Sequence, residues 1–316
     1  MFGNETSPTN LWLMIDASLK GVLRFATAIP SPRPELRDIR SINIEGVPTF
    51  TDALQRFEHE SGIPLRGTPC VMAVGGATSG ETLSPVRSRW TITRAGLAAI
   101  FGQPITIIND VAARAWAAKS EKVAATTVRG SGVPDLGRGG RFIMMNVDEG
   151  LGAAAVDADP QLGIRILETE AGHTDFGAVN EREEKLAKAV RGASPTVSWE
   201  TMLMLDVQSP VWAQACPGLA ESEKFRMLAY ILGRFAVNMM HAYGAWDGIL
   251  ITGTRGSRLL DSSNRIAFED AFRDRRNFGR LVSTCPVWLI HPHESVLTGA
   301  AQCLAEQQGY SPRKAA

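Results

Sequence analysis

A strand runs directly into a helix in the stretch ITIINDVAARAWAA, residues 105–118. Its first four residues are apolar or β-branched, which favours a buried strand, and its alanine-rich second half has high helix propensity. Asn109 and Asp110 stand at the join between the two. Because ligands of open α/β sheets collect beside the carboxyl ends of strands, this join predicts an α/β fold and a candidate site.

The sequence around this stretch predicts a duplicated α/β architecture. Strand–turn–strand units are expected at residues 11–26 and 142–156, and each leads into its own series of strands and helices. Further strands are expected at residues 70–74, 248–253 and 287–290, and helices at 49–61, 93–101, most of 180–241, 268–278 and from 295 onward. Two α/β halves with a cleft between them follow from this pattern.

Length and composition exclude several classes of protein. The chain has 316 residues, enough for two domains, and its 33 Lys and Arg balance 33 Asp and Glu. We therefore expect no global field that would attract nucleic acid or an acidic membrane. No apolar run approaches the ~18 residues that cross a bilayer, and residues 1–8 do not resemble a secretory signal. The four cysteines form no CxxC pair, so we expect a reduced, cytoplasmic protein.

Asp110 has two interpretations. It can be the N-cap of the following helix, accepting hydrogen bonds from the first helical amides. Alternatively, it is a general base at the edge of the sheet. The residue types and spacing leave both open.

Three further polar residues are candidates for a binding site. Glu170 and His173 lie three residues apart around a glycine, which lets both converge on one ligand. A metal site is the weaker interpretation, because no third ligand has suitable spacing and no HExxH order is present. A hydrogen-bonded structural pair is the plainer one. Glu200 is either a polar wall residue or a surface acid on a helix.

Taken together, eight short motifs make the chain resemble the bacterial glucokinase family in order and spacing. The resemblance extends from about residue 11 to about residue 303. It does not extend to the repressor–kinase relatives, whose zinc-binding cysteine cluster has no counterpart here. The motifs are IIND (107–110), GLG (150–152), ExxHxDF (170–176), VSxE (197–200), GRF (233–235), ITG (251–253), FED (268–270) and LxGA (297–300).

The resemblance implies an actin-like (ribonuclease H-like), hexokinase-type fold with two α/β domains and a central cleft. The expected small domain comprises residues 1–113 and 294–316, and the expected large domain comprises residues 114–293. The implied activity is ATP- and Mg²⁺-dependent phosphorylation of glucose or a similar hexose by a cytoplasmic kinase of glycolysis. No nucleic-acid or membrane partner is expected, and a homodimer is left open.

Residue roles follow from the resemblance alone. Asn109, Glu170, His173 and Glu200 would hydrogen-bond the sugar hydroxyls, together with Asp110. Asp110 would also take the proton from the 6-hydroxyl as that oxygen attacks the γ-phosphoryl group. The nucleotide side would use Asp16, Lys20, Gly150, Gly152 and Gly253. No resident metal site is expected.

The phosphate side departs from the family pattern. The family's first hairpin reads Asp-x-Gly-Gly-Thr-Asn, whereas residues 16–21 read DASLKG; the second reads Gly-Thr-Gly-Leu-Gly, whereas residues 148–152 read DEGLG. Where the family has a Gly-Gly pair on the adenosine side, this chain has Gly253-Thr254. Because the resemblance implies that the hairpins face each other, we expect Lys20 to pair with Glu149 or Asp148 unless both turns point into solvent.

Two functions therefore remain open at this point. The first is an ATP-dependent glucokinase with Asp110 as base, which the intact sugar residues favour. The second is a catalytically impaired sugar-binding protein that acts as a sensor or regulator, which the altered phosphate hairpins favour.

Overall fold

The chain folds into two compact units in the computed structural model, which describes residues 10–85, 89–119, 124–273, 278–291 and 295–310. Unit 1 comprises Met1–Lys122 and His293–Ala316, and unit 2 comprises Val123–Pro292. Residues 1–8, which entered the argument about secretion, lie outside the described ranges.

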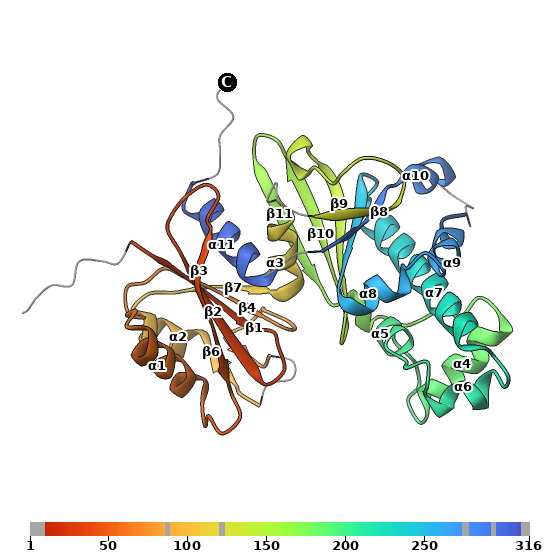
Figure 1. Cartoon of the computed structure of the whole chain (residues 1–316), viewed down its shortest axis with the longest axis horizontal. Coiled ribbons are helices and arrows are strands. Elements are labelled where there is room, and N and C mark those ends of the chain that lie inside the picture. Colours follow the sequence, from red (N-terminus) through yellow and green to blue (C-terminus); the bar gives the residue numbers. More distant parts are fainter. Residues whose placement is uncertain (1–9, 86–88, 120–123, 274–277, 292–294, 311–316) are drawn as a thin grey trace, which may run out of the picture. The chain divides into compact units, whose positions relative to one another are not determined.

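Unit 1 is a five-stranded sheet with helices on both faces (Figure 1). The strand order is β3-β2-β1-β4-β7, in which β1, β4 and β7 are parallel and the β1–β2–β3 meander is antiparallel. The strands are β1 (Trp12–Ala17), β2 (Val22–Ala28), β3 (Leu36–Asn43), β4 (Cys70–Val74) and β7 (Thr106–Asn109), with a small pair β5 (Thr82–Leu83) and β6 (Ile92–Thr93). The helices are α1 (Phe50–Ser61), α2 (Arg94–Phe101), α3 (Asp110–Ala117) and α11 (Ser295–Gln307).

Helix α3 belongs to unit 1, whose division from unit 2 falls later in the chain than the predicted domain boundary. A Cβ on Gly299 of α11 would lie 1.6 Å from the carbonyl oxygen of Ala113, so the two helices touch backbone to backbone. The predicted boundary between residues 113 and 114 would cut α3 in the middle. The division after Lys122 keeps the helix whole. The sequence pattern does not show this, because packing against α11 determines which unit the helix joins.

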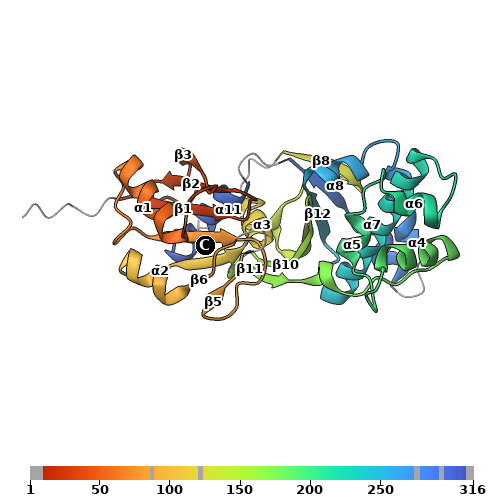
Figure 2. The same ribbon diagram turned by 90° about the horizontal axis from the view of Figure 1, so that it is seen from below.

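Unit 2 is a six-stranded mixed sheet, seen from a second side in Figure 2. The strand order is β11-β10-β9-β12-β13-β8. The strands are β8 (Ala125–Arg129), β9 (Gly140–Val147), β10 (Leu151–Asp159), β11 (Gly163–Thr169), β12 (Gly248–Thr252) and β13 (Val287–Ile290). The α-helices are α4 (Glu181–Arg191), α5 (Trp199–Leu203), α6 (Pro210–Ala215), α7 (Glu221–Tyr243), α8 (Thr254–Leu259), α9 (Arg265–Asp270) and α10 (Gly279–Thr284). Three 3-10 turns complete it: η1 (Leu136–Arg138), η2 (Ala171–His173) and η3 (Ala271–Arg273).

The core of unit 2 explains why the long helix lies where it does. Alternate residues of β9, among them Ile143 and Met145, are buried in one cluster with Leu232 and Phe235 of α7. The 23 residues of α7 thus present an apolar face to the sheet. Burying a side chain of this size contributes about 1.5–3 kcal/mol to folding stability, so these contacts hold α7 firmly against the sheet.

The predicted elements and the observed ones differ at the sheet edges. β3, β8 and β11 are edge strands that the sequence pattern does not predict. β3 reads LRDIRSIN and is exposed along most of its length, so it carries no continuous apolar signal. The helix expected at residues 268–278 begins earlier, at Arg265, and continues as η3 to Arg273; residues 274–277 lie outside the described part.

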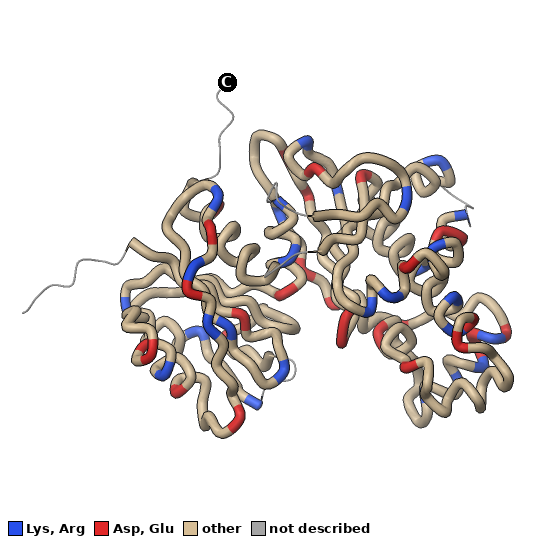
Figure 3. The backbone as a smooth tube through the Cα atoms, in the orientation of Figure 1, with Lys and Arg blue, Asp and Glu red and all other residues tan. Residues whose placement is uncertain are grey.

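Charged residues of both signs are interspersed along the described chain of both units (Figure 3). Within the described residues, no helix combines the length and the apolarity that spanning a lipid bilayer requires.

Candidate active site

Asn109, not Asp110, caps helix α3. The Asn109 Oδ1 atom accepts hydrogen bonds from the backbone N–H groups of Val111 (2.8 Å) and Ala112 (3.4 Å). Its Nδ2 donates to the carbonyl oxygen of Gly76 at 3.0 Å, which ties the start of α3 to the segment after β4. The interpretation of Asp110 as an N-cap is therefore wrong, because Asp110 is already the first helical residue. Its carboxylate does not serve as the cap.

Asp110 is a carboxyl group with an unusual environment. Its side chain is 15% exposed, and burial raises its pKa to about 6. Arg114, one turn along α3, opposes this rise, and the carboxylate of Asp16 adds to it. The Arg114 Nε atom lies 3.9 Å from Asp110 Oδ2 and has no hydrogen-bond partner among the residues that the structure describes, so the pair is a loose one. A carboxyl group whose pKa lies near neutrality is suited to accept a proton from a substrate.

The first hairpin, between β1 and β2, is held by side chains. Asp16 is 1% exposed, and its Oδ1 accepts hydrogen bonds from the Ser18 backbone N–H (3.0 Å) and hydroxyl (2.6 Å). Gly21 supplies the left-handed residue of the turn at φ +74°, and Lys20 is exposed on it. An Asp side chain that bonds the turn two residues ahead fixes that turn without the family's glycines.

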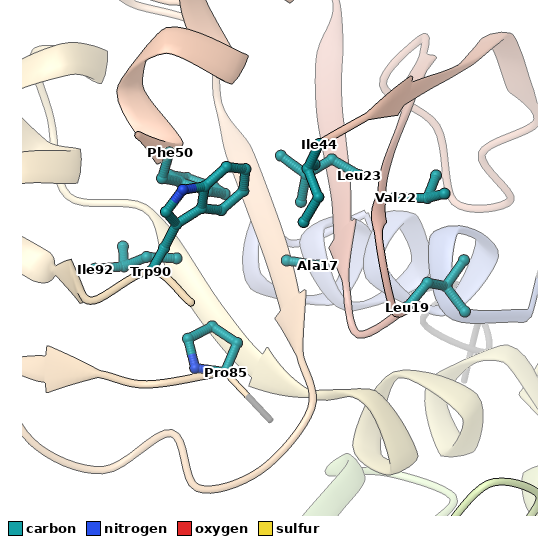
Figure 4. A pocket seen from close by; sticks show the side chains of 9 residues that line it. All are labelled: Ala17, Leu19, Val22, Leu23, Ile44, Phe50, Pro85, Trp90 and Ile92. Carbon is teal, nitrogen blue, oxygen red and sulfur yellow. The ribbon is translucent and has the colours of Figure 1, made fainter. Parts of the chain in front are cut away.

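An apolar pocket lies beside this hairpin (Figure 4). Ala17 and Leu19 line it from the hairpin side, and the Phe50 and Trp90 rings meet edge to face at 5.7 Å on the other. The remaining lining residues are Val22, Leu23, Ile44, Pro85 and Ile92. Ala17 and Leu23 also belong to the buried apolar core of unit 1, so core packing at the base of the hairpin adds to the Asp16–Ser18 bonds.

Three predicted sugar residues of unit 2 come together. His173 Nε2 lies 3.7 Å from Glu170 Oε2, and His173 Nδ1 lies 3.9 Å from Glu200 Oε1. The side chains of Glu170, His173 and Glu200 are 49%, 57% and 30% exposed, so they remain accessible to a ligand. These three residues are called the acidic–imidazole cluster below. Its carboxylates accept hydrogen bonds and its imidazole can also donate, which suits a polyhydroxyl ligand.

Backbone pairing between two distant segments builds this cluster. The Phe176 N–H donates to the Val197 carbonyl (2.8 Å), and the Trp199 N–H donates to the Thr174 carbonyl (3.1 Å). Ser198 then caps α5 through the Thr201 N–H, so Glu200 stands in the first turn of that helix. This short ladder places Glu200 beside His173, although 27 positions separate them in the chain.

The acidic–imidazole cluster is attached to the second hairpin, between β9 and β10. Glu200 Oε2 accepts a hydrogen bond from the Leu151 backbone N–H at 2.8 Å. A Cβ on Gly172 would lie 2.0 Å from the Leu151 carbonyl oxygen, so η2 packs against the same peptide. Leu151 lies between Gly150 and Gly152, two predicted nucleotide residues. The candidate sugar and phosphate residues of unit 2 therefore form one structure.

Gly253, a predicted nucleotide residue, lies where the end of β12 approaches the end of β9. It follows β12 with φ +103°, and a Cβ there would lie 2.3 Å from the Val147 carbonyl oxygen at the end of β9. Only glycine fits this close approach between the end of β12 and the second hairpin. The acids Asp148 and Glu149 occupy the turn itself, where the Asp148 N–H donates to the Gly150 carbonyl at 3.0 Å.

The predicted site residues thus fall into two groups. Asp16, Lys20, Asn109 and Asp110 belong to unit 1, whereas Gly150, Gly152, Glu170, His173, Glu200 and Gly253 belong to unit 2. Since Lys20 and Glu149 belong to different units, their pairing stays a prediction. Sequence reasoning missed Arg114 and Gly172. The four-residue spacing of Asp110 and Arg114 on one helix was the signal for the former, and no signal marked the close approach of Gly172.

Known glucokinases are similar to this chain in sequence and in fold. The family model described as Glucokinase matches residues 22–204 and 208–307. A glucokinase of Xylella fastidiosa (strain 9a5c) is 25% identical over 313 residues, covering 88% of this chain and 90% of the relative. The crystal structure of a glucokinase from an Antarctic psychrotroph has a TM-score of 0.74 at 20% identity, covering 94% and 99% of the two chains. That of the Balamuthia mandrillaris glucokinase in complex with glucose has a TM-score of 0.73 at 14% identity, covering 94% of each. The fold is therefore the actin-like two-domain fold of sugar kinases.

Proposed function

The chain belongs to the glucokinase family, and we propose that it transfers the γ-phosphoryl group of ATP to the 6-hydroxyl of glucose or a similar hexose. The observation that carries this proposal is Asp110, a mostly buried carboxyl group whose pKa is raised to about 6 and which the capping role of Asn109 leaves for chemistry. Family membership supports the sugar-kinase class. Glucose itself is the finer part of the proposal, supported by the glucose complex of the Balamuthia relative.

The acidic–imidazole cluster would bind the sugar hydroxyls. Glu170 and Glu200 accept hydrogen bonds from hydroxyl groups, and His173 donates or accepts according to its tautomer. Each bond to an ionised carboxylate contributes about 1.5–3 kcal/mol. A site that hydrogen-bonds the sugar hydroxyls in this way would disfavour analogues that lack a hydroxyl, because they would leave one of these polar groups without its partner.

Asp110 would act as the general base. It would accept the proton of the 6-hydroxyl as that oxygen attacks phosphorus, and Arg114 would stabilise the carboxylate while it is charged. A pKa of about 6 leaves Asp110 ionised at neutral pH yet basic enough to take a proton. Positioning and charge stabilisation supply most of the acceleration in phosphoryl transfer.

The residues around the two hairpins fit Mg·ATP in part. The resemblance would have Asp16 orient Mg²⁺ through water, but its carboxylate is 1% exposed and its Oδ1 already accepts two hydrogen bonds from Ser18. The close approach at Gly253 leaves no room for a side chain, which would suit a nucleotide there. When bound, Mg²⁺ neutralises charge on the transferring phosphoryl group. Glu149 in the second hairpin acts in the opposite direction, since it adds negative charge where the family has threonine. Lys20 supplies a cation on the first hairpin.

A second function is favoured by this same hairpin chemistry. The first hairpin is held by Asp16–Ser18 bonds and by the core packing of Ala17 and Leu23, and the second carries two acids. A chain with sugar residues kept and phosphate hairpins altered would bind hexose and turn it over slowly or not at all, acting as a sensor or regulator.

One pair of measurements separates the two functions. Calorimetric titration with glucose and with Mg·ATP gives binding, and a coupled assay for glucose 6-phosphate gives turnover. The kinase proposal predicts both binding events and turnover. Glucose binding with neither Mg·ATP binding nor turnover supports the sensor, and absence of glucose binding overturns both proposals for this sugar.

A further inference from the structure

Arg234 on α7 contacts residues next to the acidic–imidazole cluster but is not part of that cluster. Its side chain is 15% exposed, and its Nη1 donates to Oε2 of Glu183 at 2.6 Å. Its Nη2 donates to the carbonyl oxygen of Gly177. Glu183 is 1% exposed and also accepts the Val179 N–H at 3.0 Å, so the ion pair is buried and well satisfied. A planar guanidinium is the group that suits such a fork of acceptors.

The same guanidinium packs against two aromatic rings. Its central carbon lies 5.5 Å from the ring centroids of both Phe176 and Trp199, and those rings meet edge to face at 4.9 Å. Phe176 follows His173 by three residues, and Trp199 directly precedes Glu200. These rings belong to the two segments whose backbone ladder places His173 beside Glu200.

We propose that Arg234 is a positioning residue for the sugar site, holding the 174–177 and 197–200 segments in the register that aims His173 and Glu200 at the hexose. This inference rests on the proposed sugar binding. This positioning role belongs to α7, which lies outside both the acidic–imidazole cluster and the two hairpins. Since Glu200 also holds the Leu151 N–H, the effect of Arg234 extends to the second hairpin.

The test compares Arg234 with a matched arginine in the same unit. Arg129 on β8 also donates to a carbonyl, that of Cys285 at 2.6 Å, and its guanidinium carbon lies 4.8 Å from the Phe272 ring. β8 is the edge strand at the opposite end of the sheet from β11 and β10, and η2 contacts β10. Arg129→Met therefore removes a similar stacked arginine away from the cluster.

We expect Arg234→Met to weaken glucose binding in calorimetry about tenfold or more, since small misplacements of binding groups are costly. Arg234→Lys should recover part of this loss, because lysine retains the charge but not the planar fork. Arg129→Met should bind glucose like the parent at a temperature where all variants are folded by circular dichroism. If Arg234→Met does not fold, the comparison uses Arg234→Lys, which must then bind glucose more weakly than Arg129→Met.

Amide hydrogen exchange gives a second measurement that needs no ligand. The N–H groups of Phe176, Trp199 and Leu151 should exchange about tenfold faster in the Arg234 variants and unchanged in Arg129→Met. Unchanged glucose affinity in Arg234→Met, or equal losses in the Arg234 and Arg129 variants, overturns the inference. A parent chain that binds no glucose overturns the proposed function instead, and the exchange rates alone then decide whether Arg234 holds the two segments.

Discussion

The acidic–imidazole cluster keeps the residues of the family pattern, whereas the two hairpins depart from it. The cluster keeps its side chains, and Glu170, His173 and Glu200 meet as the resemblance implies. The hairpins keep their place at the ends of β1 and β9 but exchange glycine and threonine for charged and apolar residues. Sugar is bound by side chains, whereas phosphate is bound largely by backbone amides, so a hairpin can retain its path while its chemistry changes.

Charge is the main consequence of the altered hairpins. Two unit charges 4 Å apart interact by about 4 kcal/mol at an effective dielectric constant of 20. Glu149 near a phosphate would therefore weaken nucleotide binding substantially unless a cation compensates. The cluster would carry no such conflict, because its carboxylates would face neutral hydroxyls under the proposed function.

The largest expected effect is on turnover in Asp110→Asn. Loss of the base should lower kcat by about 100-fold or more, with glucose affinity in calorimetry close to that of the parent. The helix cap is unaffected, because Asn109 provides it. Turnover equal to that of the parent would refute the base assignment. A parent without turnover would show that the change in the hairpins, not the base, limits this chain.

Gly172→Ala tests whether the cluster and the second hairpin form one structure. The added Cβ would meet the Leu151 carbonyl oxygen, which belongs to the backbone and cannot rotate away. We expect glucose affinity to fall about tenfold and unfolding stability by about 1–3 kcal/mol, measured by calorimetry and urea denaturation. Gly177→Ala is the control, since a Cβ there meets nothing within 4 Å. Equal behaviour of the two variants would contradict the backbone contact.

Within the cluster, Glu200→Ala should weaken glucose binding more than Glu170→Ala. Glu200 is the less exposed of the two and also holds the Leu151 N–H, whose loss leaves a backbone donor unpaired at about 1–3 kcal/mol. Glu170→Ala should cost at least several-fold in affinity. Titration of both variants with glucose gives the ranking. Unchanged affinity in both would remove the sugar site from this cluster.

The raised pKa of Asp110 predicts a specific dependence of stability on pH. Because the folded chain holds this proton more tightly than the unfolded chain, the neutral form favours folding below pH 4, and that benefit is lost as pH rises through about 6. Asp110→Asn should therefore be more stable than the parent by about 1–3 kcal/mol above pH 7, with the difference vanishing near pH 4. Urea denaturation at several pH values measures it. A difference independent of pH would refute the raised pKa.

The smallest expected effect is a gain of function in the second hairpin. Glu149→Thr should improve Mg·ATP affinity several-fold, because it removes a negative charge and leaves Lys20 to meet phosphate. The gain should shrink at high salt, as exposed charges are screened. Glu181→Thr, which removes an exposed acid on α4, controls for net charge. No gain over this control would mean that the hairpin acids do not face the nucleotide.

The sequence by itself determined the alternation of strands and helices, the strand-to-helix join at Asn109-Asp110 and the family. These depend on local apolar periodicity and on short motifs that stay intact when the rest of the chain diverges. Edge strands such as β3 were not predicted from the sequence, because their exposed residues carry no apolar pattern. Helix α9 begins earlier than predicted for a related reason, because a helix rich in charged residues has no clear apolar periodicity to mark its ends.

Only the tertiary structure decided which residues act together. It shows that Asn109 caps α3 through two hydrogen bonds, so Asp110 is not the cap of that helix. It joined Glu200 to Leu151, 49 positions away, and packed Arg234 against the rings of Phe176 and Trp199. The physical reason is that burial, pKa and side-chain contact depend on neighbours brought in from distant parts of the chain, which no local pattern encodes.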